Sequence, residues 1–589
     1  MTPARFAGVI APRSDRRAEL VERLSHAALP SGALGRTLDN DLLVLLSHSP
    51  TPPLLAREEG AIIGPLFSRG QASARTQLAP SAQAMIAASA GGHLLDAWWG
   101  HYVAVLAGGA GRRVTIVRAP MGALPVYWLE TSDGVVFGSD LALLRDAGFF
   151  TPAIDRTALA RFLVANNVRT RETCLQGLYE VQGGDRLLVE DGRITIEAGW
   201  SPWDWAARDR ALLDAREAAA RVRDAVLHSV AAMRSPHERV VLKLSGGLDS
   251  SIVAAALKAA GRPFTCLTLV TANPSGDERA FATATAKAVG ESLVERMRDQ
   301  ALVELTRSEA GNLPRPTMRA FMQASRALAA SVARETGATA ILDGSGGDGV
   351  FCSLQSVRPV LDCLRAPEGR PELKRVVRTL AEVSQAGIPQ IAWRTLQALW
   401  RPASYPVLRD DRFLSRVALD LSDEAGAHPW LVCPADALPA KAAHVAMIVT
   451  AQSVAEAADP LDPLPTLSPL MAQPVIETCL RVPSWLWLDQ GRNRAAARHG
   501  FADRLPPEIA WRRSKGTPDS FLIDLFETHR ATIRALLLEG VLASLDLLDT
   551  AALAPVVDDR RPVTGYDFVR VMRLVDIEVW ARAMQARER

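Results

Sequence analysis

The sequence has few cysteines, no long apolar run and little net charge, and each shortage excludes a class of protein. Its six cysteines show no CxxC spacing, so neither a zinc site nor a disulfide framework is expected. No apolar run approaches the roughly 18 residues of a membrane span, and residues 6–11 do not form a signal peptide. A net charge of +2 gives no electrostatic case for nucleic acid. We therefore expect a cytoplasmic protein that binds neither membrane nor nucleic acid.

Lysine is also scarce. Among the 67 basic residues we count six lysines, at positions 243, 258, 287, 374, 441 and 515. Because the chain uses arginine almost everywhere that a generic positive charge suffices, a lysine that is kept points to a specific site. For Lys258, Lys287 and Lys374 a compositional accident is the better explanation.

The chain of 589 residues is long enough for two or more domains. Residues 1 to about 205 form short β-like runs, with Asp133-Gly134 and Asp191-Gly192 as hairpin signals, which predicts an antiparallel sheet domain. From residue 206, helix-like segments alternate with apolar runs at 240–244, 264–270 and 339–342, which predicts a doubly wound parallel sheet. Beyond residue 355 the chain is expected to be mostly helical.

The most informative stretch is residues 245–251, Ser-Gly-Gly-Leu-Asp-Ser-Ser, between an apolar run and a helix-like run. A glycine turn between strand and helix lets the backbone approach an anion, toward which the free N–H groups of the new helix point. The carboxylate of Asp249 would repel phosphate unless a cation lay between them, which indicates a nucleotide-phosphate site with magnesium. Walker loops and Rossmann fingerprints have a different spacing. An ordinary strand–helix turn is the alternative.

Residues 343–351, Asp-Gly-Ser-Gly-Gly-Asp-Gly-Val-Phe, form a second glycine loop after an apolar run. In a doubly wound sheet this strand end can lie beside the first loop, which would bring Asp348 near Asp249. Two aspartates from separate strand ends suit a magnesium ion on a triphosphate better than one. A flexible glycine turn is the alternative.

Two further segments are ambiguous when taken alone. Asp277 and Glu278 begin an Ala-rich stretch, where the helix dipole favours carboxylates, so capping is their expected role. Residues 512–516, Arg-Arg-Ser-Lys-Gly, form either a basic arm over phosphates or a solvated turn. Because Lys515 is one of only six lysines, both interpretations of this segment are kept.

In their order along the chain, the segments at 245–251, 276–290, 344–351 and 505–516 resemble the synthetase domain of the asparagine synthetase family. Segments at 99–103, 118–122, 125–128 and 137–140 resemble the glutaminase domain of the same family. The resemblance covers nearly the whole chain. It implies a β-rich antiparallel, glutaminase-like domain of the N-terminal-nucleophile type over residues 1–205. An ATP pyrophosphatase domain, with a doubly wound parallel sheet and added helices, is implied over 206–589.

The sequence departs from the family where ammonia is made and used. Active glutaminase domains of this family carry Cys after the initiator Met, whereas this chain has Thr2, and no Asn-Gly-Glu glutamine-binding segment is evident. Threonine can act as a nucleophile when its own α-amine activates it, but we expect a purely structural domain. The family's synthetase loop usually carries Glu and an Asp-Glu pair where Ser345 and Asp348-Gly349 stand here. The amine must therefore come with the substrate.

Two subfamilies use an amine within the substrate, the β-lactam synthetases and the lasso peptide cyclases. The segments that look like lasso cyclase segments are 346–352, 428–431, 439–444, 468–470, 482–488 and 512–521. β-Lactam synthetases use a Tyr–Glu pair, and residues 344–352 contain no Tyr. The His428-Pro429-Trp430 segment also fits a plain buried Trp after a proline turn. Three competing hypotheses for the whole chain are a β-lactam or other amide synthetase, an ammonia-dependent asparagine synthetase and a non-catalytic peptide-binding scaffold.

The lasso cyclase resemblance implies an ATP-dependent, AMP-forming carbon–nitrogen ligase that acts on a short precursor peptide. A side-chain carboxylate of Asp or Glu would attack the α-phosphorus of ATP. The free α-amine of the peptide would then attack the acyl-adenylate and close an isopeptide ring, a macrolactam. A leader-peptide-binding protein and a leader protease are implied partners, because the α-amine must first be freed.

The same resemblance gives roles to single residues. Asp249 and Asp348 would hold Mg²⁺, and Lys515 would neutralise charge at the α-phosphate or the departing pyrophosphate; these three are the implied catalytic residues. The implied nucleotide site consists of Leu244, Ser245, Gly246, Gly247, Asp249, Ser250, Ser251, Val270, Gly344 and Lys515.

Overall fold

The computed structural model describes most of the chain. It covers residues 4–28, 34–48, 55, 59–108, 113–165, 168–271, 276–405, 409–423, 428–513 and 519–588. Thr2 and Lys515 lie outside the described residues. Within the described ranges, no helix is both long and apolar enough to cross a membrane.

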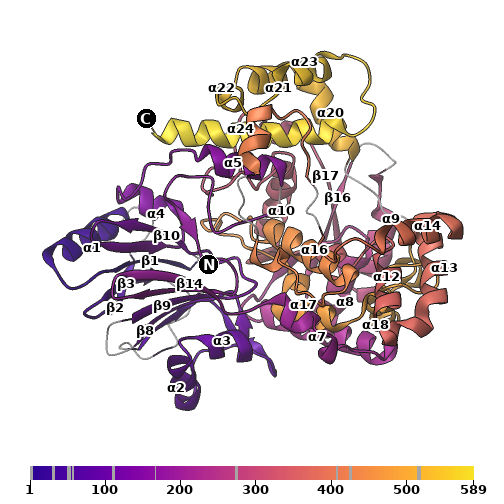
Figure 1. Ribbon diagram of the computed structural model, residues 1–589, viewed down its shortest axis with the longest axis horizontal. Coiled ribbons are helices and arrows are strands. Elements are labelled where there is room, and N and C mark those ends of the chain that lie inside the picture. Colours follow the sequence, from indigo (N-terminus) through magenta and orange to yellow (C-terminus); the bar gives the residue numbers. More distant parts are fainter. Residues whose placement is uncertain are drawn as a thin grey trace.

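The N-terminal part of the chain folds into two antiparallel sheets that stack face to face (Figure 1). The first has the order β12 (Tyr179–Glu180), β10 (Tyr127–Thr131), β11 (Gly134–Gly138), β1 (Arg5–Ile10), β3 (Leu43–His48) and β2 (Gly35–Asp39). The second has the order β14 (Arg193–Ala198), β13 (Asp185–Glu190), β9 (Arg113–Arg118), β8 (Val103–Gly108) and β4 (Gly60–Ile63). Phe6, Val105 and Phe137 are fully buried in the apolar core that the two sheets share.

Two hairpins form at the predicted turns. β13 and β14 pair with Glu190 opposite Arg193, which leaves Asp191 and Gly192 as a two-residue loop with φ values of +48° and +78°. Positive φ at both positions is what a type I′ turn requires, and it favours an Asp-Gly pair. β10 and β11 pair with Thr131 opposite Gly134, so the loop between them ends at Asp133.

Helices and a small third sheet complete this part of the chain. α1 (Asp15–Ala28) and α4 (Leu141–Asp146) pack together and against the first sheet. The third sheet has the order β6 (Gln71–Ala74), β5 (Leu66–Ser68) and β7 (Trp98–Gly100). The other helices are α2 (Pro80–Ala88), α3 (Gly92–Ala97), α5 (Arg156–Val164) and α6 (Pro202–Ala206).

The C-terminal part is built around a five-stranded parallel sheet. Its order is β17 (Leu293–Met297), β16 (Thr265–Val270), β15 (Val240–Lys243), β18 (Ala340–Leu342) and β19 (Thr466–Leu467). β15 comes first in the chain but lies in the centre, so the strand order reverses between β15 and β18. Ligands of such sheets bind beyond the carboxyl ends of the strands at this point.

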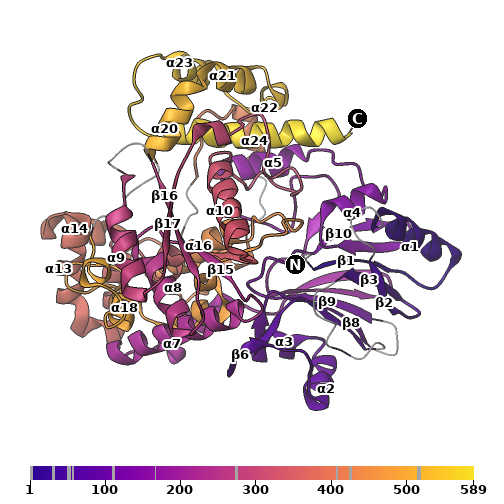
Figure 2. The ribbon, with the colours of Figure 1, turned by 180° about the vertical axis from the view of Figure 1, so that it is seen from behind.

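Helices cover both faces of the parallel sheet (Figure 2). α7 (Ala215–Arg234), α8 (Leu248–Ala259) and α9 (Arg279–Val289) pack on one face, and α10 (Met322–Thr336) packs on the other. The predicted fold class is confirmed: an antiparallel β-rich domain precedes a doubly wound parallel sheet. The short strands β17 and β19 were not predicted.

The rest of the chain is mostly helical, as predicted. Its helices are α11 (Gly347–Val350), α12 (Arg358–Arg365), α13 (Leu373–Ser384), α14 (Ile388–Ala398), α15 (Arg416–Ser422), α16 (Pro439–Ala455), α17 (Gln473–Arg481), α18 (Ala495–Phe501), α19 (Pro507–Ala510), α20 (Asp519–Thr528), α21 (Arg530–Leu538), α22 (Val541–Ser544), α23 (Thr550–Asp558) and α24 (Asp567–Glu588). Figures 1 and 2 both show α24 crossing the upper part of the molecule, below α21 and α23 and above α5. These two helices contribute to one hydrophobic cluster that joins the N-terminal and C-terminal parts.

The His428-Pro429-Trp430 segment lies where the two parts meet. The Trp430 ring packs edge-on against Trp200 at 5.1 Å, and its carbonyl accepts a hydrogen bond of 2.9 Å from the indole N–H of Trp203. Nδ1 of His428 accepts the backbone N–H of Trp430, and burial lowers the pKa of His428 to about 3. These contacts support the plain interpretation of this segment, a buried Trp that joins the two parts.

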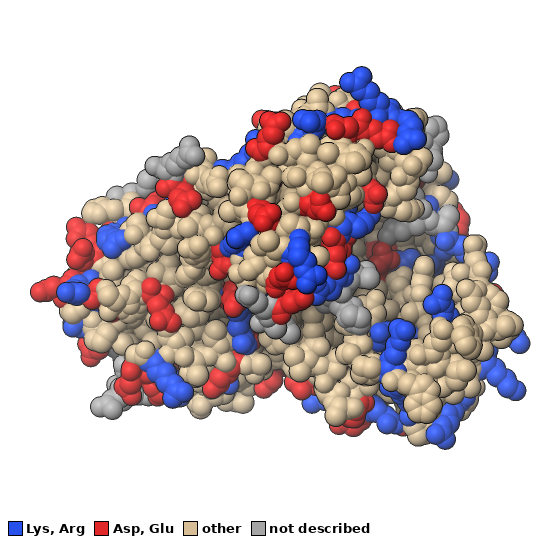
Figure 3. Space-filling view, turned by 45° about the horizontal axis from the view of Figure 1, so that its top comes forward, with Lys and Arg blue, Asp and Glu red and all other residues tan. Residues whose placement is uncertain are grey.

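Charges of both signs are spread over the surface, but basic side chains prevail on the lobe formed by α12, α13 and α14 (Figure 3). The exposed basic residues of this lobe include Arg370, Lys374, Arg378, Arg394 and Arg401. Trp393 and Trp400 on the same lobe are also exposed, at 59% and 89%. The lobe thus combines positive charge with exposed aromatic rings.

Candidate active site

The two glycine loops lie side by side because they follow adjacent parallel strands. β15 and β18 pair with Leu242 opposite Leu342, and both loops leave the sheet at its carboxyl edge. A Cβ on Gly344 would lie 2.6 Å from the backbone nitrogen of Ser250, and one on Gly347 would lie 2.4 Å from Cγ of Asp249. Any side chain there would clash, so glycine is what permits the two loops to approach this closely.

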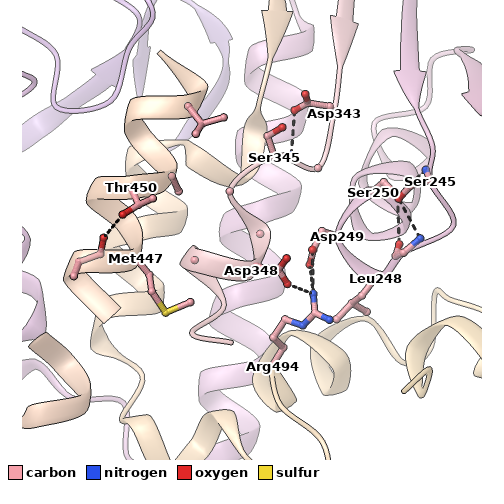
Figure 4. A pocket seen from close by; sticks show the side chains of 18 of the residues that line it. Ser245, Leu248, Asp249, Ser250, Asp343, Ser345, Asp348, Met447, Thr450 and Arg494 are labelled. Atoms are coloured by element: carbon pink, nitrogen blue, oxygen red, sulfur yellow. Dashed lines mark hydrogen bonds and ion pairs between the residues drawn. The ribbon is translucent and has the colours of Figure 1, made fainter. Parts of the chain in front are cut away.

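Asp249 and Asp348 meet at the guanidinium of Arg494 (Figure 4). Nη1 of Arg494 donates to both carboxylate oxygens of Asp249 at 3.0 Å and to Oδ1 of Asp348 at 2.8 Å. Arg494 directly precedes α18 and has a left-handed backbone, with φ of +56°. No pattern in the sequence around Arg494 pointed to this contact, so sequence reasoning missed the residue.

The donor set of Asp249 and Asp348 fits a magnesium ion that is shared with phosphates. The two carboxylates already converge on one cationic nitrogen, so the space between them suits a cation. The described ranges contain no group of three or more His, Cys, Asp or Glu that could hold a metal. Phosphate oxygens and water would therefore complete the shell, as is usual for Mg²⁺. Metal binding by this pair stays a prediction.

A cavity of about 1010 Å³ lies over the two loops. On the loop side it is lined by Lys243, Ser245, Gly247, Asp249, Ser250, Asp343, Gly344 and Asp348. The other walls are formed by α16, through Met447, Thr450, Ala451 and Val454, and by Tyr405, Arg409, Asp410, Arg412 and Arg573. Segments that are far apart in the sequence thus share one chamber.

Ser251 does not line this chamber, and its contact with the pyrophosphate of ATP stays a prediction. Its side chain is fully buried, and Oγ lies 3.0 Å from the hydroxyl of Thr285 in α9. Successive residues of a helix point about 100° apart, so Ser250 lines the cavity while Ser251 packs against α9. The pair Ser250-Ser251 therefore supplies one hydroxyl to the cavity wall instead of two.

Three other predicted nucleotide-binding residues lie at the edge of the site. Leu244 follows β15 and Val270 ends β16, and both are buried. Gly246 turns the first loop at φ +73°, where a Cβ would lie 2.6 Å from Cβ of Phe281. None of the three lines the cavity, and their contact with a nucleotide stays a prediction.

The basic segment after α19 reaches the first loop. Arg512 donates a hydrogen bond of 3.2 Å to the carbonyl of Gly246 and pairs with Glu278 at 2.7 Å. Its guanidinium carbon lies 3.7 Å from the ring centroid of Phe281, and its side chain is only 9% exposed. Arg512 is thus not part of a solvated turn. Lys515 lies outside the described residues, so its role stays a prediction.

Asp277 lies two residues before α9, not in its first turn as the sequence led us to expect, but its side chain still bonds the backbone at the start of the helix. Its Oδ1 accepts the backbone N–H of Arg279 at 3.0 Å. Hydrogen bonds from the side chain and backbone of Arg279 lower the pKa of Asp277. Its neighbour Glu278 instead forms the ion pair with Arg512.

α16 packs against the second glycine loop and supports it. His444 shares a hydrogen bond of 2.9 Å with the carbonyl of Val350, and the backbone of Gly349 lies against Met447. The amine of Lys441 donates to the carbonyls of Leu480 and Val482, and burial lowers the pKa of Lys441 to about 8. The role of Lys441 is therefore to tie α16 to the end of α17.

A buried ionic network joins the N-terminal part to the same helix. Glu180 pairs with Arg118 at 2.7 Å and with Arg169 and Arg315. Arg118 also pairs with Glu456, directly after α16, at 2.6 Å. Burial alone would raise the pKa of Glu180, but the three guanidinium groups outweigh it and lower the pKa to about 2. The network thus fixes the N-terminal part against the helix that lines the cavity.

The family model described as asparagine synthase matches residues 221–582, which is more than half of the chain and includes both glycine loops. The chain belongs to the asparagine synthase family. As a member of this family it is an ATP-dependent, AMP-forming carbon–nitrogen ligase. The model described as glutamine amidotransferase domain matches residues 83–200, from α2 to the end of β14. These matches confirm the resemblance at the level of the asparagine synthase family.

Two solved structures that match are remote likenesses of this asparagine synthase family protein. Glutamine phosphoribosylpyrophosphate amidotransferase from B. subtilis, complexed with ADP and GMP, shares 10% identity over 58% of this chain and 90% of its own, with a TM-score of 0.22. An NMN synthetase from Francisella tularensis shares 16% identity over 26% of this chain and 59% of its own, with a TM-score of 0.16. A search of curated proteins found no match.

Proposed function

We propose that this protein is a lasso peptide cyclase. It adenylates the side-chain carboxylate of an Asp or Glu in a precursor peptide and joins it to the peptide's own α-amine. The observation that carries the proposal is the cavity. Its volume of about 1010 Å³ is at the upper end of the roughly 300–1,000 Å³ that single-ligand pockets span. It runs from the glycine loops along α16 to Arg412 and Arg573 and so has room for a bulky second substrate beside ATP.

The altered residues of the second loop support the same proposal. Ser345 stands where the resemblance leads us to expect Glu, and Gly349 stands where it leads us to expect the second acid of an Asp-Glu pair. The aspartates that face ATP are kept. A site that has lost its asparagine-forming residues but kept its ATP loops fits a substrate that brings its own amine.

The residues around the loops would do the following work. Backbone N–H groups of the first loop and the hydroxyls of Ser245 and Ser250 bind the phosphates of the substrate ATP. Asp249 and Asp348 would hold Mg²⁺, which neutralises phosphate charge when bound. The peptide carboxylate then displaces pyrophosphate at the α-phosphorus, and attack by the α-amine releases AMP.

The proposal includes partners and a compartment. The precursor peptide must reach the cavity with a free α-amine, so a leader-binding protein and a leader protease would act beforehand, in the cytoplasm. The lobe of α12–α14 supports contact with a protein partner, because exposed Trp400 lies among exposed basic side chains of the described surface.

A panel of synthetic peptides tests the function. Each carries a free α-amine and one Asp or Glu at a varied distance from it, and is incubated with the protein, ATP and Mg²⁺. We expect at least one peptide to lose the mass of one water while AMP and pyrophosphate form in equal amounts. The same peptide with an acetylated α-amine should support ATP–pyrophosphate exchange but not close. Asparagine formation from aspartate and ammonia, with no peptide turnover, would contradict the proposal.

A further inference from the structure

Lys243 places a charge at the end of the central strand of the parallel sheet. Residues two apart on a strand share a face, and Val241, on the same face, packs into the apolar cluster under α10. The side chain of Lys243 is 21% exposed and lines the cavity. An ammonium at such a position loses hydration, and this chain uses lysine at only six positions. We therefore expect Lys243 to have a specific role in the site and not to be a generic surface charge.

Asp343 faces Lys243 from the next strand. Its Oδ2 lies 3.5 Å from Nζ of Lys243, while Oδ1 accepts hydrogen bonds from the backbone N–H of Ser345 at 3.1 Å and from Oγ of Ser468 at 2.8 Å. Figure 4 shows Asp343 beside Ser345, at the opposite end of the loop from Asp348. Three adjacent strands, β15, β18 and β19, thus hold this carboxylate in place at the cavity wall.

The N–H donors of the Lys243 ammonium can serve a bound anion. At 3.5 Å its contact with Asp343 is longer than a normal hydrogen bond. Within the described part of the chain, no acceptor has hydrogen-bond geometry to Nζ. An ammonium carries three donors, so Lys243 can bind an anionic group that enters the cavity without giving up a strong bond.

We infer that Lys243 and Asp343 receive the two reacting groups of the substrate, with Lys243 binding the carboxylate that is activated and Asp343 the amine that attacks. This inference rests on the proposed function and names the subsite that function needs. The substrate brings a carboxylate and an ammonium that must meet inside the cavity. For these two groups the protein offers the ammonium of Lys243 and the carboxylate of Asp343, which lie 3.5 Å apart and beside the phosphate loop.

The two steps use these residues differently. In the first, Lys243 offsets the repulsion between the peptide carboxylate and the polyphosphate while the carboxylate oxygen bonds to the α-phosphorus and pyrophosphate leaves. In the second, the amine nitrogen bonds to the acyl carbon, the bond from acyl carbon to phosphate oxygen breaks, and AMP leaves. The ammonium must lose protons for this step, and Asp343 accepts them and passes them to water.

Measuring the two steps separately tests the assignment, with the peptide that the unaltered protein cyclises as the probe. Adenylation is followed by ATP–pyrophosphate exchange and by capture of the activated peptide with hydroxylamine; ring closure is followed by mass. We expect Lys243→Met to lose exchange by about 10²-fold or more. Asp343→Asn should keep exchange and hydroxylamine capture but lose ring closure by about 10²-fold or more. Asp343→Glu should restore part of the closure.

Controls separate this assignment from a structural ion pair. Lys243→Met/Asp343→Asn removes both charges of the pair but keeps the Oδ1 acceptor for Ser345 and Ser468, so stability should change little. We expect it to fold with a similar thermal midpoint and to close no rings, while Lys287→Met, on the surface of α9, stays fully active. Ring closure at the normal rate in Asp343→Asn or in the double variant overturns the inference and leaves the function standing. If the unaltered protein activates no peptide at all, both the proposed function and the assignment of Lys243 and Asp343 are wrong.

Discussion

Asp249 and Asp348 share one nitrogen of Arg494, although they lie on loops that follow different strands. Their carboxylates therefore sit close enough for a single cation to serve both. The glycines at 344 and 347 create this closeness, since a Cβ at either position would strike the first loop. The pair is thus prepared for a cation before any nucleotide arrives.

Removing either carboxylate should stop the reaction. We expect Asp249→Asn and Asp348→Asn each to lower peptide cyclisation by about 10²-fold or more, because each removes one charged ligand of a shared magnesium. Product formation is measured across magnesium concentrations, with circular dichroism as the check on folding. Near-normal activity of either variant at ordinary magnesium would show that the two-aspartate site is wrong.

Replacing Arg494 should increase the effect of the metal on stability. In Arg494→Met the two carboxylates lose the guanidinium that lies between them, so a divalent cation gains more by entering. We expect Mg²⁺ with ATP to raise the thermal midpoint of this variant by more than it raises that of the unaltered protein. Arg416→Met, at an exposed ion pair of α15, is the control. Equal midpoint shifts in Arg494→Met and the unaltered protein would mean that Arg494 and the metal do not compete.

The basic residue Lys515 should matter to rate more than to ATP binding. We expect Lys515→Ala to lower cyclisation by roughly 10²–10³-fold, the usual cost of one preorganised charge at a developing negative charge. Lys515→Arg should also be poor, because the guanidinium is larger and its charge is more spread. Steady-state rates and nucleotide binding are compared, with Lys287→Ala as the control. A fully active Lys515→Arg would make this residue a generic basic contact.

The N-terminal part should have no glutaminase chemistry. We expect no release of glutamate from glutamine and no change in product yield for Thr2→Ala, because the sequence lacks the Cys and the glutamine-binding segment of active domains. Glutamate is measured with an enzyme-coupled assay after incubation with ATP, peptide and glutamine. Glutamate release that disappears in Thr2→Ala would overturn this prediction.

The network around Glu180 should stabilise the protein above acidic pH. Glu180 has a pKa of about 2 when folded, against an ordinary value of 4.5, so the folded state binds its proton less readily than the unfolded state. The stabilisation is therefore complete above about pH 4.5 and is lost as the pH falls toward 2. Glu180→Gln should cost about 3–5 kcal/mol at neutral pH, because it leaves buried guanidinium groups without their partner.

Thermal midpoints of the unaltered protein and Glu180→Gln, measured from neutral to acidic pH, check this. The gap between them should close as the pH falls below about 4.5. Glu190→Gln, at an exposed hairpin end, should show no gap at any pH. A gap for Glu180→Gln that does not change with pH would mean that the charge of Glu180 is not what stabilises the contact.

The glycine loops and hairpins could be predicted because each depends on contiguous residues. A type I′ turn needs two positions of positive φ, and Asp191-Gly192 supplies them within two residues. A phosphate loop needs glycine, a hydroxyl and a helix N-terminus in succession, and residues 245–251 contain all three. The order of the two loops along alternating strands and helices also indicated that they would share one edge of a parallel sheet.

The tertiary structure alone decided which side chains meet. Arg494 reaches the two aspartates, Lys243 faces Asp343, and the hydroxyl of Ser251 lies against that of Thr285. None of these contacts joins neighbours in the sequence; each depends on how helices and strands from distant segments pack. The sequence by itself thus determined the turns and the glycine loops of an ATP-dependent ligase, because each depends on contiguous residues. The partners of its charged side chains were set by packing, because burial and distance between remote residues exist only in the folded chain.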